Sequence, residues 1–384
     1  MTLHDALDLS RQLAQQVLAP RAEEVDRKGL WPEHGIRALQ RAGLGGLVAP
    51  VTAGGSGLGL GAVARVCEEL GAACSSTSMS FGMHCVGTAV LAARATPEQL
   101  ERYLVPIARG EHLTTLALSE PGTGANFYVP QTQLSVDPDG SFRLNGSKSF
   151  VTNGGHADSY VVSTAPADPG APPGQFSCVL VRSDAPGLHW QGSWEGWGMR
   201  GNSSISVQLA EVPVPPSDLL GHQGDEIWYV FHVVAPYFLM AMAGTYLGVA
   251  ASALEEGRQH LLERSYAHSG QSLSSETVLQ HRLGTLWAQV ERTRALVHAA
   301  ADKGDAGAPD ALLALCSAKA EVADCAERVA SEVMTLMGGR AYGQRSTIQR
   351  LYRDARAAHV MAPTTDMLRT WTGRALLGLP LLGE

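Results

Sequence analysis

Three segments place hydroxyl groups and glycines where a ligand could approach the backbone. Residues 116–127, LALSEPGTGANF, leave an apolar run and enter a glycine-containing loop, which lets backbone N–H groups come close to a ligand. Residues 148–162, KSFVTNGGHADSYVV, set the hydroxyl of Thr152 in an apolar run before a tight Asn-Gly-Gly turn. Residues 194–209, WEGWGMRGNSSISVQL, add two tryptophans and an arginine. These groups suit binding and orienting a ligand.

A helix break lies near the end of the chain, in HVMAPTTDML at residues 359–368. Pro363 should end one helix there, and Thr364 can cap the next. The unpaired N–H groups at a helix start suit a carbonyl or phosphate oxygen. Taken alone, the segment is better explained as a proline-terminated helix with a threonine cap.

Length and composition limit the class of protein. The chain has 384 residues, so two or three domains are expected, and its net charge of −8 argues against a nucleic-acid or anionic-membrane binder. The thirteen histidines form no metal-binding pattern, so no metal site is expected. Six cysteines without CxxC spacing predict buried, reduced thiols. Because no signal-peptide core or membrane-spanning run is present, a cytoplasmic protein is expected.

Hydrophobic periodicity predicts an α+β chain of three domains. Residues 1–112 have helical spacing, residues 113–216 contain about seven short strand-like runs typical of a β-barrel or sandwich, and residues 217–384 return to helical spacing. The last region contains four long helices that should form a bundle. The glycine-rich segment 51–66 lacks the strand–turn–helix frame of a nucleotide-binding loop and is interpreted as a turn into a helix.

Four motifs in this order resemble the acyl-CoA dehydrogenase family of flavoproteins. SEPGTGAN resembles its T-E-P-x-x-G-S-D loop, and GSKSFVTNGGHADSYVV resembles its G-x-K-x-W-I-T-N-x-x-x-A-D strand pair. GWGMRGNSSISVQLAEVPVPPSDLLG resembles its G-x-R-x-S…V-P-x-x-x-L-L-G stretch, and MGGRAYG with LYRDAR resembles its G-G-x-G and R-D-A segments. The resemblance covers essentially the whole chain. It implies an N-terminal helical domain, a middle β-barrel domain and a C-terminal four-helix bundle.

The resemblance implies FAD as cofactor and assigns its contacts. Thr152 would hydrogen-bond near flavin N5, the hydride acceptor, and Thr335 to Gly339 would touch the cofactor of a neighbouring subunit. The FAD-contacting positions are Leu118, Ser119, Gly124, Ala125, Phe150, Thr152, Thr335, Gly338, Gly339, Thr364 and Asp366. The positions expected to face an acyl thioester are Tyr229, Phe238, Leu239, Ala362 and Pro363.

The catalytic base of the family has no counterpart in this sequence. Removing a proton α to a thioester carbonyl needs a positioned carboxylate with a raised pKa. The family carries this glutamate at the position of Ala362, or on the first long bundle helix where Phe238 and Leu239 stand here. The catalytic residue is therefore unknown.

Four other titratable residues are candidates for the base, although a histidine on a long helix is more often structural and Asp366 matches a cofactor contact. The candidates nearby are His232, His359, Tyr237 and Asp366. Glu120 is expected to brace its loop. Asp354, between Arg353 and Arg356, is interpreted as part of a structural ion pair.

Several FAD contacts of the family are also replaced. Its pyrophosphate-binding arginine becomes Tyr266, its flavin-side tryptophan becomes Phe150, and its loop serine becomes Ala125. The leading hypothesis is nevertheless an FAD-dependent oxidoreductase that acts at the α,β carbons of a CoA or acyl-carrier-protein thioester, with hydride transfer to N5. A flavin-dependent monooxygenase or oxidase is the first alternative, because such relatives do not need the glutamate. A non-catalytic flavin-binding or scaffold protein is the second.

The resemblance also implies partners. A homo-oligomer, either a dimer or the family's usual homotetramer, is expected, with an electron-transfer flavoprotein as a candidate electron acceptor.

Overall fold

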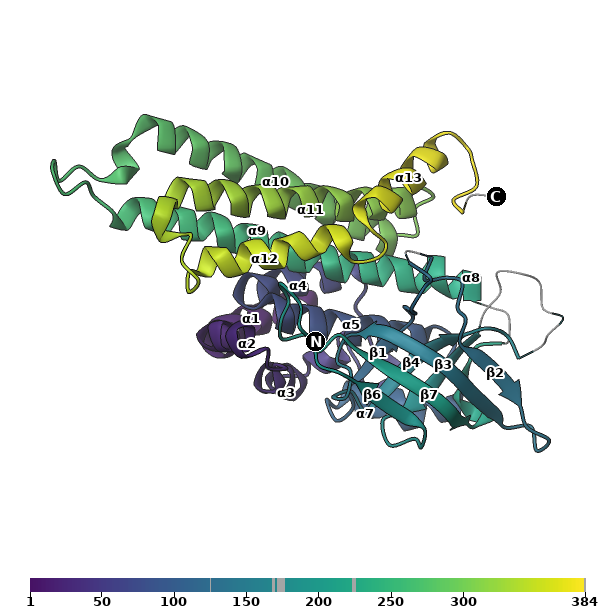
Figure 1. Cartoon of the computed structure of the whole chain (residues 1–384). Helices are drawn as coiled ribbons and strands as arrows, with labels where there is room; N and C mark the ends of the chain where they lie inside the picture. The colour runs from purple at the N-terminus through teal and green to yellow at the C-terminus, as the bar shows by residue number, and fades with distance from the viewer. Residues whose placement is uncertain (125, 168–169, 171–176, 223–225, 383–384) are drawn as a thin grey trace.

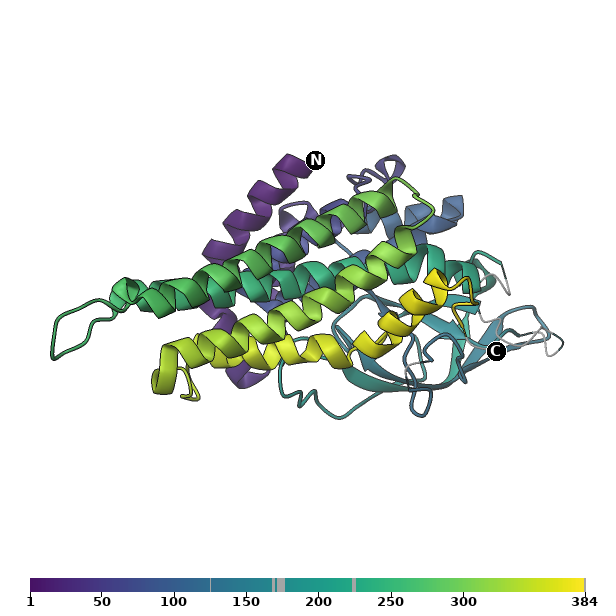
Figure 2. The same ribbon diagram turned by 90° about the horizontal axis from the view of Figure 1, so that it is seen from above.

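The computed structural model describes residues 1–124, 126–167, 170, 177–222 and 226–382. The N-terminal helices form one layer and the long C-terminal helices form a second layer above them (Figure 1). The sheets lie beside the N-terminal helices and under one end of the C-terminal helices. Figure 2 shows these long helices running side by side. The expected order of helices, strands and helices is confirmed.

The N-terminal region is helical, as expected for residues 1–112. Its helices are α1 (Leu3–Leu13), α2 (Ala22–Lys28), α3 (Glu33–Arg41), α4 (Leu60–Ala73), α5 (Ser75–Ala93), α6 (Pro97–Gln99) and α7 (Val105–Ala108). Both α4 and α5 pack against the bundle helix α9.

The middle region forms two four-stranded sheets. The strands are β1 (Thr114–Ala117), β2 (Gln133–Val136), β3 (Phe142–Val151), β4 (Ser159–Thr164), β5 (Ser177–Arg182), β6 (Leu188–Gln191), β7 (Ile205–Val214) and β8 (Leu219–Leu220). The strand orders are β1-β4-β5-β8, with β1 and β4 parallel, and β2-β3-β7-β6, which is antiparallel. The sequence predicted either a β-barrel or a β-sandwich. The described strands form two separate sheets.

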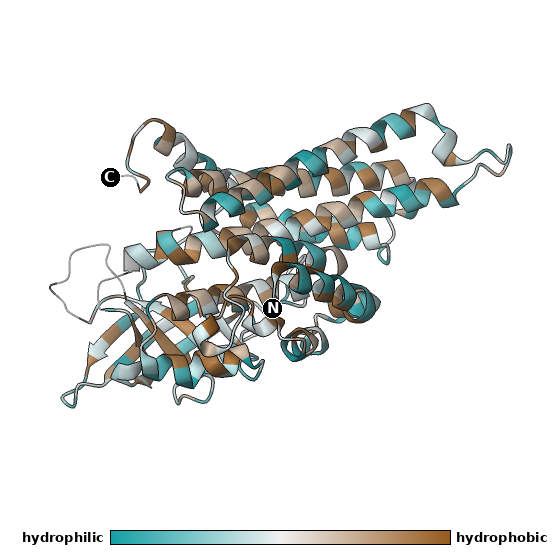
Figure 3. Cartoon of the chain, turned by 180° about the vertical axis from the view of Figure 1, so that it is seen from behind, coloured by the Kyte–Doolittle hydropathy of each residue, from teal (hydrophilic) through white to brown (hydrophobic). Residues whose placement is uncertain are grey.

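The C-terminal region is the expected bundle. Its helices are α8 (Glu226–Tyr229), α9 (Ala235–Glu263), α10 (Thr277–Asp305), α11 (Ala311–Met337), α12 (Thr347–Val360) and α13 (Thr365–Leu376). Hydrophobic and hydrophilic residues alternate along the outer helices (Figure 3), as in amphipathic helices. The segment Val230–Glu263 is long and apolar enough to cross a membrane, but 89% of its most apolar stretch is buried inside the protein, as in a core helix.

Glycines bring α4 and α9 into close contact. A Cβ at Gly244 would lie 2.1 Å from the carbonyl oxygen of Ala64, and one at Gly248 would lie 2.2 Å from that of Glu68. Any side chain at these positions would push the helices apart, because interiors are close-packed. The glycines therefore fix how the N-terminal helices, including α5 at the site, sit against the bundle.

The glycine-rich segment 51–66 ends in a helix start that a carboxylate of the same chain occupies. The backbone N–H groups of Leu60 and Gly61 donate to the carboxylate of Asp305, at 2.6 and 2.8 Å. A Cβ at Gly59 would lie 2.1 Å from Asp305 Oδ1, so glycine is needed for the close approach. The interpretation of this segment as a turn into a helix is confirmed.

All six cysteines are among the described residues, are buried, and form no disulfide. This agrees with the expectation of buried, reduced thiols.

Asp305→Ala should lower the free energy of unfolding by about 1 kcal/mol, because two N–H groups at the start of α4 lose a charged cap. The measurement is urea denaturation followed by far-UV circular dichroism. Glu263→Ala removes an exposed carboxylate from the end of α9 and is the control, with stability expected to stay within error. Equal stability of both variants would mean that the cap contributes nothing.

Candidate functional site

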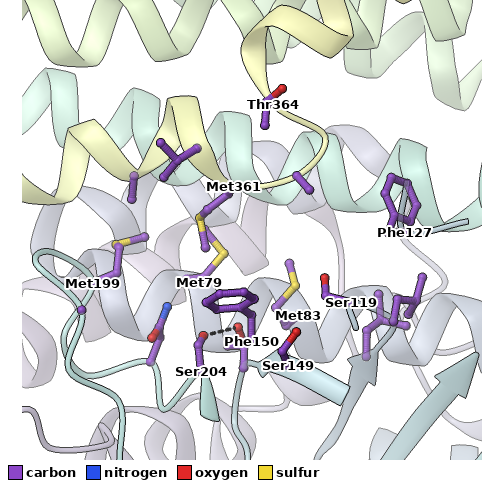
Figure 4. A pocket seen from close by; sticks show the side chains of 18 of the residues that line it. Met79, Met83, Ser119, Phe127, Ser149, Phe150, Met199, Ser204, Met361 and Thr364 are labelled. Carbon is purple, nitrogen blue, oxygen red and sulfur yellow. Dashed lines mark hydrogen bonds between the residues drawn. The ribbon is translucent and has the colours of Figure 1, made fainter. Parts of the chain in front are cut away.

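A cavity of about 830 Å³ lies where the sheets, α5 and the bundle meet (Figure 4). Its walls come from the loop after β1 (118–124), the end of β3, the loop before β7 (194–204), α5, α9 and the chain between α12 and α13. The lining is mostly apolar, and hydroxyls of Ser119, Ser149, Thr152 and Ser204 face the same space. An apolar cleft with a few convergent polar groups is typical of a ligand site.

A buried ion pair holds the loop 118–124. The carboxylate of Glu120 accepts hydrogen bonds from Lys148 Nζ at 2.6 Å and from the backbone N–H groups of Gln131 and Thr132 at 2.6 and 3.1 Å. Burial alone would raise the pKa of Glu120, but Lys148 and these hydrogen bonds outweigh it, so the pKa is lowered. Burial lowers the pKa of Lys148 to about 8. Glu120 thus braces the loop, as expected.

An irregularity in β3 turns Phe150 into the cavity. The β3–β7 register shifts between Lys148 and Val151, and Phe150 has φ +55°, a left-handed conformation rare for an aromatic residue. Bulges of this kind re-aim side chains near functional sites. Phe150 is 66% exposed as a residue, and its ring packs edge-on against Trp194. Thr152 Oγ1 lies 2.9 Å from Ser204 Oγ (Figure 4).

Asp354 of α12 holds the loop 194–204. It accepts hydrogen bonds from the backbone N–H of Met199 at 2.7 Å and from Ser75 Oγ of α5 at 2.5 Å. Burial raises the pKa of Asp354, because water is excluded from the carboxylate.

Arg353 makes a second connection to the same loop. Its guanidinium donates to the carbonyl oxygen of Trp197 at 2.7 Å and forms a bidentate pair with Asp26 of α2. The expected ion pair of Asp354 with its neighbouring arginines is therefore wrong, since Arg353 pairs with Asp26 and Arg356 pairs with Glu327.

The break between α12 and α13 forms the upper wall of the cavity. The hydroxyl of Thr364 accepts a hydrogen bond from the backbone N–H of Met367, so the expected cap is confirmed. Lys319 of α11 donates from Nζ to the carbonyl oxygens of Ala358, Met361 and Pro363 at 2.8, 3.3 and 2.8 Å. The sequence analysis did not identify Lys319. Its position as the one lysine inside the largely apolar run ALLALCSAKAEVADCA could have marked it as a buried charge.

Most of the expected site residues meet at this cavity. Those that line it are Leu118, Ser119, Gly124, Phe150, Thr152, Phe238, Ala362, Pro363 and Thr364. Ala125 lies outside the described residues.

The remaining expected residues lie elsewhere. Leu239 and Tyr229 are buried outside the lining, and the Arg94 guanidinium lies 5.8 Å from the centre of the Tyr229 ring. Asp366 is exposed on α13. Thr335, Gly338 and Gly339 are exposed at the end of α11 and do not line the cavity of their own chain. Their assignment to a neighbouring subunit stays a prediction.

The cavity holds no free carboxylate among its described lining residues. Its titratable lining residues are Glu120, Arg353 and Arg356, and Glu120 is committed to Lys148.

The candidate bases named from the sequence do not line the cavity. The His359 ring contacts Glu327 at 2.9 Å, and the His232 ring stacks on Trp228. Tyr237 is also outside the lining, and burial raises its pKa to about 12.

Three family models match consecutive parts of the chain. They are the N-terminal, middle and C-terminal domains of acyl-CoA dehydrogenase, over residues 3–111, 115–212 and 238–377. A cyclohex-1-ene-1-carbonyl-CoA dehydrogenase of Geobacter metallireducens is 31% identical over 97% of each chain. The chain belongs to the acyl-CoA dehydrogenase family. It is thus an acyl-CoA dehydrogenase-like oxidoreductase, of the class that acts on CH–CH bonds.

Solved structures show the same acyl-CoA dehydrogenase fold. Butyryl-CoA dehydrogenase from Megasphaera elsdenii has a TM-score of 0.91 and 27% identity, over 98% of this chain and 99% of that one. A chain from a structure described as the electron transferring flavoprotein of Acidaminococcus fermentans has a TM-score of 0.90 and 28% identity, over 98% of both chains.

The free energy of unfolding should rise with pH more steeply in the wild type than in Lys319→Met. Burial lowers the pKa of Lys319 to about 7, from 10.5 for an unperturbed lysine. Between these two pKa values the unfolded chain therefore binds one more proton than the folded chain. The contribution of Lys319 to the free energy of unfolding is thus fully present at high pH and is lost as the pH falls towards 7. The three carbonyl acceptors oppose the burial effect, so the difference in slope is at most about 1.4 kcal/mol per pH unit.

The measurement is urea denaturation of both proteins from pH 6.5 to 10. The titration of Lys148 is common to both and cancels in the comparison. Parallel pH profiles would show that Lys319 keeps its proton in the folded state.

Proposed function

We propose that the cavity binds FAD and that the chain oxidises an acyl thioester there. The single observation that supports this proposal is the meeting of the loop 118–124, Thr152 and the break 361–364 around one cavity. Its volume of about 830 Å³ lies within the range of cofactor pockets, about 300–1,000 Å³.

The residues of the loop 118–124 fit a bulky planar cofactor with a phosphate tail. Gly122 and Gly124 have φ of +88° and +55°, and a Cβ at either would meet nothing within 4 Å, so the backbone borders open space. Leu118 and Ser119 would border the ring, and Thr152 would place its hydroxyl against the polar edge of the ring. A bound flavin supplies a hydride acceptor at N5.

The break 361–364 would position the thioester. Ala362 and Pro363 line the cavity between Met361 and Thr364, which lie across it from Ser149 and Ser204 (Figure 4), and Phe238 of α9 also lines it. These walls exclude water, which strengthens hydrogen bonds to a thioester carbonyl. Lys319 donates hydrogen bonds to the carbonyl oxygens of Met361 and Pro363, which restrict the conformation of the break.

The lack of a base supports a second candidate function. The positions where the family carries its glutamate are Ala362 and the α9 residues Phe238 and Leu239, which cannot remove a proton. A flavin-dependent monooxygenase or oxidase does not need that carboxylate, and a dry pocket favours its chemistry.

Assembly and partners follow from the family. We infer a homo-oligomer, a dimer or tetramer, because Thr335, Gly338 and Gly339 are exposed and do not line the cavity of their own chain. An electron-transfer flavoprotein is the proposed electron acceptor, and the cytoplasm is the proposed location.

Flavin extraction and anaerobic photometry test the proposed function. The purified protein should release FAD, rather than FMN, on denaturation. Bleaching of the flavin by an acyl-CoA or acyl-carrier-protein thioester would support dehydrogenation. No bleaching, with an oxygenated product from the reduced protein and air, would support the monooxygenase. A colourless protein that does not take up FAD would contradict both the dehydrogenase and the monooxygenase.

Ala362→Glu should accelerate anaerobic flavin reduction by an acyl-CoA by at least about 100-fold, because it supplies a general base at the cavity wall. Ala362→Gln has nearly the same shape without a base and is the matched control. The measurement is stopped-flow absorbance with both variants and the wild type. If Glu and Gln gave the same rate, the missing carboxylate would not limit the reaction.

A further inference from the structure

Asn202 has a side-chain amide that finds no partner within the described chain. The residue is fully buried and lines the cavity, yet neither Nδ2 nor Oδ1 makes a hydrogen bond to any described residue. Its backbone is fixed, since its carbonyl oxygen accepts from the N–H of Asn153 at 3.0 Å and its N–H donates to Met199 at 3.2 Å. The backbone of Asn202 is therefore held in place, while the hydrogen-bonding capacity of its side-chain amide is unused.

The neighbouring Asn153, by contrast, has both polar atoms of its side-chain amide paired. Its Nδ2 donates to the carbonyl oxygen of Ser80, and its Oδ1 accepts from Trp31 Nε1, both at 2.9 Å. Buried side-chain amides in folded proteins are normally satisfied in this way. An unsatisfied amide at a cavity wall suggests that a ligand supplies the partner.

Asn202 lies on one side of the cavity, away from the loop 118–124. In the sequence, Asn202 lies between Met199 and Ser204. Figure 4 shows Met199 and Ser204 on one side of the cavity, and Ser119 and Phe127 on the other. Methionine side chains also line this side, and they offer only weak acceptors. The two lining arginines, Arg353 and Arg356, are already paired with Asp26 and Glu327. Among the described lining residues, Asn202 is therefore the one whose buried polar side-chain atoms have no partner.

We propose that Asn202 determines specificity by hydrogen-bonding a polar group on the acyl part of the thioester. This inference rests on the proposed function. An amide both donates and accepts, so a hydroxyl, amino or amide group on the acyl chain fits it. A plain alkyl chain leaves both atoms unpaired, and sites built to bond a polar group discriminate strongly against analogues that lack it. The substrate class is therefore a polar-substituted acyl thioester.

Binding of matched thioesters to the FAD-loaded protein tests this assignment. The ligands are hexanoyl-CoA and a series of hydroxyhexanoyl-CoAs with the hydroxyl moved along the chain, and the readout is the dissociation constant from perturbation of the flavin spectrum. At one hydroxyl position the wild type should bind at least about 10-fold tighter than hexanoyl-CoA, as expected for one buried hydrogen bond. Asn202→Leu should remove or reverse this preference.

Two further measurements separate a specificity role from a structural one. Asn202→Leu should leave the thermal midpoint of the ligand-free protein unchanged or raise it, because it removes an unpartnered buried amide. Ser203→Ala is the control for loop disturbance, since Ser203 Oγ donates to the carbonyl of Gly154 and lies outside the cavity lining. This variant should keep the wild-type ratio of dissociation constants.

Three outcomes would overturn the inference. A wild type with no preference for any hydroxyl position would refute it. If Asn202→Leu weakened FAD binding about 10-fold and left the ratio unchanged, the amide would serve the cofactor instead. A wild type that bound neither FAD nor thioesters would overturn the proposed function as well, whereas binding of both without a polar preference would overturn this inference alone.

Discussion

Two consecutive residues of α12 join all three parts of the chain around the cavity. Asp354 bonds Ser75 of the N-terminal helices and Met199 of the loop before β7, while Arg353 bonds Asp26 of the N-terminal helices and Trp197 of the same loop. Buried polar groups are costly unless every partner is present, so this network is stable in one arrangement only. The cavity wall at 194–204 takes its position from these contacts.

The chemistry of the cavity follows from what its walls contain. Hydroxyls and backbone groups face an otherwise apolar space, and the one described carboxylate at its edge, Glu120, is neutralised by Lys148. Such a site can bind and orient a cofactor and a thioester. The described side chains in its lining provide no group that is free to remove an α proton, which is the step that the family's glutamate performs.

Local features of the fold were predictable from the sequence, and long-range contacts were not. The break at Pro363 and the cap by Thr364 depend on residue types within their own segment. By contrast, Lys319 meets carbonyls about forty positions away, and Asp305 caps a helix that starts at Leu60. Periodicity carries no information about such pairs, because it reports which face of a helix is buried and not what that face meets.

The most direct test of the central claim is a crystal structure of the protein grown with FAD. We expect density for the flavin ring inside the cavity, between Thr152 and the break that begins at Met361, with the methionine-lined side near Asn202 left open for an acyl group. A ring bound elsewhere, or a cavity closed by its own side chains with FAD in excess, would contradict it.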